Sequence, residues 1–144
     1  MPENVFDKPS AEPDVFELCR DEKRGKNLND LYCICRLERS DAEYAAEVAL
    51  DPRHEVYAGH FPGHPVTPGV CLLAIVRACV GRALGRPAAF AAIKSCKFIA
   101  PVIPAEGERL RVAFSIAEAG EVRCTMEWQG NTVLKFAGTL APAR

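Results

Sequence analysis

A histidine inside a proline- and glycine-rich segment is the group in this sequence best suited to acid–base chemistry. The segment runs from His60 to Val70 and contains three prolines and two glycines. Proline fixes φ and glycine permits close backbone approach, so this segment is expected to hold His60 in one place. A helix is expected to begin at Gly69, where unpaired N–H groups would polarise a nearby carbonyl. Together these features favour proton transfer beside a polarised carbonyl group.

Three other side chains are weaker candidates for chemistry. His64 is expected to be a solvated loop residue, because Pro62 and Pro65 prevent the helix that would turn two histidines into a metal-binding pair. His54 is expected to lie on the surface. Cys71 lies near the expected helix start, where thiol pKa values fall, but core packing is the favoured interpretation. No metal or cofactor site is predicted.

The elements that must position this segment follow from the apolar pattern. Residues 70–84 are apolar on nearly all sides, with only Arg77 and Arg82 charged, which predicts a buried helix ended by Gly85. Turns are expected at 39–41 and at 130–131. Strands are predicted over 31–37, 44–50, 89–100, 109–117, 122–128 and 132–140. This pattern indicates an α+β fold in which a curved antiparallel sheet wraps around one long central helix.

Composition restricts the class of protein. The 144 residues carry a net charge of -1, which gives no reason to expect nucleic acid as a partner. The longest apolar stretch, 70–76, is too short to cross a membrane, and the N-terminus lacks the apolar region of a secretory signal. The seven cysteines are interpreted as buried free thiols of a cytoplasmic protein. Residues 1–26 are predicted to form a loosely ordered arm with a short helix near 15–20, and 27–144 a single domain.

The proline–glycine segment resembles a motif of the hot-dog-fold beta-hydroxyacyl-[acyl carrier protein] dehydratases. The similarity is specific over 60–70, where the order is His-Phe-Pro-Gly-x-Pro-Val-x-Pro-Gly-Val, and weaker over 93–104. It implies a homodimer whose sheets join and whose acyl chain lies at the interface, with larger oligomers left open. It also implies a hydro-lyase acting on a beta-hydroxyacyl thioester of acyl carrier protein or coenzyme A, in fatty acid or related acyl or polyketide metabolism.

The resemblance also implies individual residue roles. His60 matches the histidine that exchanges a proton at the α-carbon, and the backbone N–H of Gly69 matches the group that polarises the thioester carbonyl. The positions implied to bind substrate are Phe61, Gly69, Val70, Leu73 and Ala74.

Ala74 departs from the family pattern. The family carries Glu or Asp at this position to handle the departing hydroxyl, and alanine cannot transfer a proton. Residues 69–105 contain no Asp or Glu at all. Two alternatives follow: a non-catalytic acyl-thioester-binding subunit, or, ranked lower because it also needs a carboxylate, an acyl thioesterase.

The distribution of charge offers one further indication. Residues 69–105 carry five basic residues and no acid, so the rest of the chain has a net charge of -6. A basic face would suit an acidic carrier protein or the phosphates of a pantetheine cofactor, whereas scattered solvated charges would have no such meaning. The sequence does not decide between the two.

Overall fold

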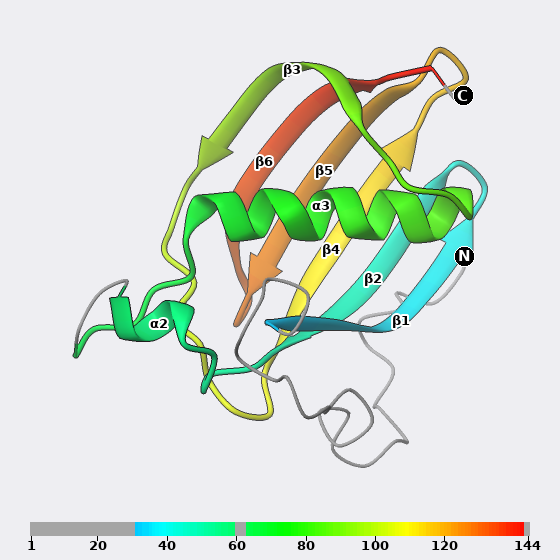
Figure 1. The fold of residues 1–144 in the computed structure, drawn as a ribbon. Helices are drawn as coiled ribbons and strands as arrows, with labels where there is room; N and C mark the ends of the chain where they lie inside the picture. Colours follow the sequence, from blue (N-terminus) through cyan, green and yellow to red (C-terminus); the bar gives the residue numbers. More distant parts are fainter. Residues whose placement is uncertain (1–30, 60–62, 143–144) are drawn as a thin grey trace.

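Six strands form one antiparallel sheet that curves around a long helix, in a computed structural model that describes residues 31–59 and 63–142 (Figure 1). The order across the sheet is β1-β2-β4-β5-β6-β3. The strands are β1 (Tyr32–Ser40), β2 (Glu43–Leu50), β3 (Phe90–Phe98), β4 (Arg109–Ile116), β5 (Glu121–Trp128) and β6 (Asn131–Leu140), and the helices are α2 (Val56–Gly59) and α3 (Gly69–Leu84). The predicted α+β architecture is confirmed. The arm predicted over 1–26, with its short helix, lies outside the described residues.

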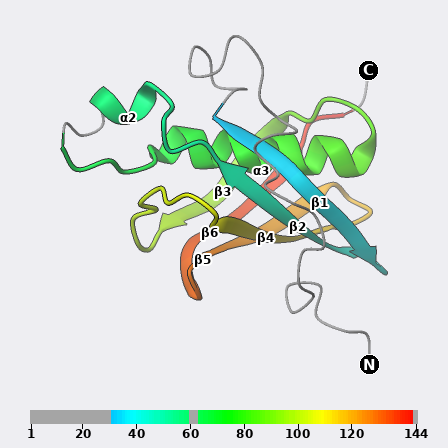
Figure 2. The same ribbon diagram turned by 90° about the horizontal axis from the view of Figure 1, so that it is seen from below.

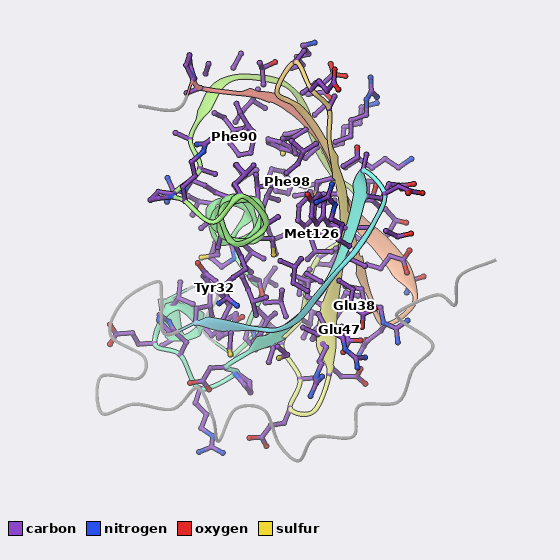
Figure 3. The ribbon with its side chains drawn as sticks, turned by 90° about the vertical axis from the view of Figure 1, so that its right-hand side faces the viewer. Tyr32, Glu38, Glu47, Phe90, Phe98 and Met126 are labelled. Carbon is purple, nitrogen blue, oxygen red and sulfur yellow. The ribbon has the colours of Figure 1, made fainter. Side chains whose placement is uncertain are left out.

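Alternating side chains divide the sheet into a face against α3 and an outer face. Val112 and Phe114 of β4 are buried together with Met126 of β5, whereas Glu38 and Glu47 belong to the opposite face. Figure 3, which looks along α3, shows Met126 between helix and sheet and the two glutamates beyond the sheet. The period of two in the sequence therefore predicted which side chains enter the core.

Helix α3 is bounded as the sequence predicted. Pro68 is its N-cap, and Gly85 adopts φ 73° and donates its N–H to the carbonyl of Gly81. A left-handed backbone at a helix end favours glycine because glycine has no Cβ to clash.

The expectation that α3 is buried all round is wrong for one face. The sheet covers only the side that carries Leu72, Ile75, Val76, Cys79 and Val80. The opposite side, called the open face here, is formed by Val70, Ala74, Arg77 and Ala78. Val70 is 67% exposed, and Ala74 and Ala78 are half-buried. A single sheet covers one side of a helix only, as the view from below in Figure 2 also shows.

Three local features differ from the sequence-based expectation. The turn between β5 and β6 is made by Gln129 and Gly130, both with positive φ, so Asn131 pairs with Trp128 inside the ladder. Helix α2 was not predicted, because four residues show no helical period. The first turn also shifts, since Ser40 still pairs with Glu43.

The two edges of the sheet have different surfaces. Strand β1 is half-buried over most of its length, whereas β3 is exposed at most positions and pairs only with β6. Ile93 and Phe98 of β3 and Ile99 just beyond it are each about half exposed. An exposed apolar edge strand is a surface on which another strand can pair.

Cys71, Cys79 and Cys124 are buried thiols, as predicted, whereas Cys35 and Cys96 are only half-buried. Burial raises the pKa of the Cys79 thiol to about 12, so it stays protonated at neutral pH. The free-thiol interpretation is wrong for Cys33, which is disulfide-bonded. Neither described helix has the length and apolar character needed to cross a membrane.

Candidate active site

The loop between β2 and α2 is fixed by hydrogen bonds to Asp51 and His54. The N–H of Asp51 donates to the carbonyl of Leu31 at 2.7 Å, and the carboxylate of Asp51 accepts from the N–H of Arg53 at 2.9 Å. The Nδ1 of His54 accepts from the N–H of Val56 at 3.0 Å. His54 is only 5% exposed, so the expectation that it lies on the surface is wrong. Its ring organises the turn that leads into α2.

A buried pair of hydroxyl groups links the two sides of the histidine segment. Tyr57 of α2 and Thr67 lie 2.9 Å apart through their hydroxyl oxygens, and the N–H of Thr67 donates to the carbonyl of Val102 at 2.8 Å. Burial raises the pKa of Tyr57 to about 12, so the phenol remains protonated. The chain is thus anchored three residues before His60 and again at Thr67. Residues 60–62, including His60 and Phe61, lie outside the described residues.

The start of α3 lies beneath an aromatic ring. A Cβ at Gly69 would come within 2.8 Å of Cζ of Phe98, so a larger residue would force the ring to move. Pro68 gives the helix no side-chain capping hydrogen bond. The first N–H groups of a helix have no partner within the helix, so those of Gly69 and Val70 are suited to donate to a ligand oxygen. A pocket of about 460 Å³ adjoins this point, lined in part by Gly69, Phe98 and Ile99.

A second depression, called the Ala74 groove here, runs along the open face of α3. It has a volume of about 440 Å³ and is lined by Tyr32, Ala74, Arg77, Ala78, Gly81, Arg86, Pro87 and Ala88. No carboxylate is among these described lining residues. Figure 3 shows Tyr32 on the helix side of the sheet, below α3. Strand β1 therefore contributes to the groove a phenol that the sequence analysis missed.

The predicted substrate-binding residues of α3 separate into two environments. Val70 and Ala74 lie on the open face, and Gly69 lies between that face and Phe98. Leu73 is half-buried and packs against the main core, so only part of it is available to a ligand.

His64 and Cys71 occupy the solvated and core positions that the sequence analysis favoured over chemical roles. His64 is exposed, as predicted. Cys71 is buried beside Leu31 and Tyr57, and burial raises its thiol pKa, which confirms core packing over a nucleophilic role. Glu55 is exposed on the loop before α2. Within residues 31–59 and 63–142, no three His, Cys, Asp or Glu side chains are grouped so as to hold a metal ion.

Some basic residues of 69–105 lie together beside the Ala74 groove, and one forms an ion pair with a glutamate. Arg77 and Arg86 both line the Ala74 groove. Lys94 instead pairs with Glu121 at 2.8 Å on the exposed sheet surface. Two of the five basic residues thus lie beside the groove, while Lys97 is exposed on β3.

Known structures with a similar fold identify the fold class of this protein. The dehydratase heterocomplex ApeI:P from Xenorhabdus doucetiae aligns with a TM-score of 0.66 at 23% identity, over 76% of this chain and 97% of that one. An uncharacterized protein from Erwinia carotovora subsp. atroseptica aligns with a TM-score of 0.60 at 25% identity, over 76% and 93%. The curved sheet around one helix is the hot-dog fold.

The family follows from the sequence comparison. The profile of the ApeI-like family, described as ApeI dehydratase, matches residues 36–137. The chain belongs to this family of hot-dog-fold dehydratases.

Curated relatives agree over a shorter region. The 3-hydroxyacyl-[acyl-carrier-protein] dehydratase FabZ of Fusobacterium nucleatum is 40% identical over 57 residues, covering 36% of this chain and 40% of that protein. FabZ of Granulibacter bethesdensis is 36% identical over 92 residues, covering 58% and 47%. The chain thus spans less than half the length of these two relatives.

Proposed function

We propose that the protein dehydrates a beta-hydroxyacyl thioester. The observation that carries the proposal is the start of α3, where Gly69 lies under the Phe98 ring and Pro68 leaves the first N–H groups without a side-chain cap. This arrangement lies at the end of the segment that contains His60, in a chain that belongs to a family of dehydratases.

The chemistry uses two groups that the chain can supply at this point. The imidazole of His60 removes a proton from the α-carbon of the substrate. The N–H groups of Gly69 and Val70 stabilise the negative charge that develops on the thioester oxygen, aided by the positive end of the α3 dipole. The electron pair of the C–H bond becomes the new double bond, the bond between the β-carbon and oxygen breaks, and a separate proton donor or solvent converts the leaving hydroxyl to water.

The test compares two histidines of the same loop. His60→Ala is expected to reduce enoyl formation from a 3-hydroxyacyl thioester by about 10²- to 10⁴-fold, because it removes the base. His64→Ala is the matched control, since His64 is exposed, and it should leave the rate nearly unchanged. Enoyl product is followed by its absorbance. Full activity in His60→Ala would overturn the mechanism.

A second candidate is a thioester-binding subunit that depends on a partner for its acid. Ala74 favours this function, because no carboxylate lines the described part of the groove. It predicts that the purified chain binds a 3-hydroxyacyl thioester without turnover, and that Ala74→Glu creates dehydration. Turnover by the unaltered chain alone would exclude it.

The acidic carrier protein or coenzyme A remains the proposed donor of the acyl group. Arg77 and Arg86 beside the groove would attract the phosphate of a pantetheine arm or the acidic carrier itself. Raising the salt concentration should therefore raise KM, since surface attraction is screened. The cytoplasmic location and the single domain over 27–144 stay predictions.

The proposed assembly is a dimer joined through β3. Its open edge and its half-exposed apolar side chains would be covered by a second hot-dog subunit. Ile93→Lys should shift the sedimentation coefficient toward that of a monomer. Asn131→Lys, at the exposed first residue of β6, is the control and should leave the sedimentation coefficient unchanged. An unchanged assembly in Ile93→Lys would place the interface elsewhere.

A further inference from the structure

The Ala74 groove contains a side chain that can give up a proton. Tyr32 from β1 lines it together with Ala74 and Arg77 of α3. Alanine has no proton to give, and a guanidinium is not deprotonated in proteins. Among the described residues that line the groove, the Tyr32 phenol is therefore the only side chain able to act as a proton donor.

The surroundings of Tyr32 suit that role. Its side chain is half-buried on the helix side of the sheet, as Figure 3 shows. Burial raises the pKa of its phenol, as does the neighbouring Cys79, while the positive charge of Arg77 opposes the rise. At neutral pH the phenol thus holds its proton, and Arg77, which lines the same groove, carries a positive charge that favours the phenolate.

We propose that Tyr32 donates the proton to the departing hydroxyl, replacing the carboxylate absent at Ala74, while Arg77 stabilises the phenolate. The inference rests on the proposed dehydration. The base takes the α-proton, the double bond forms between the α- and β-carbons, and the β-carbon–oxygen bond breaks. The oxygen keeps the bond pair and receives the Tyr32 proton, which produces water. The proton held by the base then returns through solvent to the phenolate, so both groups are restored.

The experiment separates proton donation from every other part of the reaction. Wild type, Tyr32→Phe and Tyr44→Phe are each assayed with a 3-hydroxyacyl and a 3-fluoroacyl pantetheine thioester of equal chain length. Fluoride is a stable anion in water and leaves without a proton, so its elimination needs the base and the oxyanion donors but not the acid. Tyr44 is the matched control, because it stacks on Phe114 away from the groove lining.

The expected result is a split between substrates. Tyr32→Phe should lose about 10²- to 10⁴-fold in kcat with the hydroxy substrate and less than about threefold with the fluoro substrate. The retained fluoride release also shows that the variant is folded. Tyr44→Phe should match wild type with both.

Three outcomes would overturn the proposals in different ways. Equal rates for Tyr32→Phe and wild type on the hydroxy substrate would refute the role of Tyr32 and leave the dehydratase function intact. An equal loss on both substrates would assign Tyr32 a structural role and refute proton donation. A wild type that turns over neither substrate would refute the proposed function itself.

Discussion

The two faces of α3 have different surroundings, although they belong to one sixteen-residue helix. The face against the sheet carries Ile75 and Val76, which are completely buried among strand side chains. The open face carries Val70, Ala74 and Arg77, which lie outside the main core, and the last two line a groove. The buried face thus stabilises the fold, whereas the open face remains accessible to a ligand. Alanine at position 74 is therefore compatible with the fold, because this position lies outside the main core.

The largest expected effect on stability comes from a substitution on the sheet-facing side of α3, compared with one on the open face. Ile75→Ala removes a fully buried side chain from the sheet-facing side and should lower the free energy of unfolding by about 2–5 kcal/mol. Val70→Ala, on the open face, should change it by less than about 0.5 kcal/mol. Urea unfolding measures both. Similar losses for the two variants would mean that the open face is covered in the protein as it stands in solution.

A smaller effect is expected at the hydroxyl pair that anchors the loop before α3. Tyr57→Phe leaves the buried Thr67 hydroxyl without this partner and should lower the free energy of unfolding by about 1–2 kcal/mol. The double variant with Tyr57→Phe and Thr67→Val should lose less free energy of unfolding than the sum of the two single variants, because the two hydroxyl groups interact. A double-mutant cycle in urea is the measurement. Strict additivity would show that the 2.9 Å contact contributes nothing to stability.

A stability effect smaller than that of Tyr57→Phe is expected at Gly69, where the two faces of α3 meet. Gly69→Ala forces the Phe98 ring aside, but the ring is half exposed and can rotate, so the unfolding free energy should change by less than about 1 kcal/mol. The site should nevertheless change, and kcat/KM should fall. Gly59→Ala is the control, since a Cβ there meets no atom within 4 Å. If the effect of Gly69→Ala on unfolding persists in a Phe98→Ala background, the ring contact is not its cause.

The sequence predicted the elements better than it predicted the groove. The period-two pattern of β4 to β6 and the glycine that ends α3 both act locally, so the strands and the helix end could be found from nearby residues. Tyr32 could not, because its approach to Ala74 depends on how β1 and α3 pack, far apart in the sequence. The burial of His54 was missed for a related reason, since its ring serves a turn that no periodicity marks.

The difference between the two faces of α3 also explains why the motif over residues 60–70 predicts the place of the site better than the reaction at the site. The Phe98 ring lies against the backbone of Gly69, where a Cβ would come within 2.8 Å of it, so this part of the motif concerns local geometry. Position 74 concerns chemistry instead, because alanine in the groove has no proton to donate. In the proposed mechanism, Tyr32 of β1 supplies the proton that position 74 of α3 does not.

Binding of the thioester at the open face can be tested by an amide NMR titration with an unreactive acyl-pantetheine analogue that retains a carbonyl. If the open face binds the thioester, the N–H signals of Gly69 and Val70 should shift downfield, with accompanying changes at Ala74 and Tyr32. The outer face of the sheet around Glu38 should be unaffected. Shifts confined to the outer face, or saturable binding that leaves Gly69 and Val70 unchanged, would show that the thioester does not bind at the start of α3.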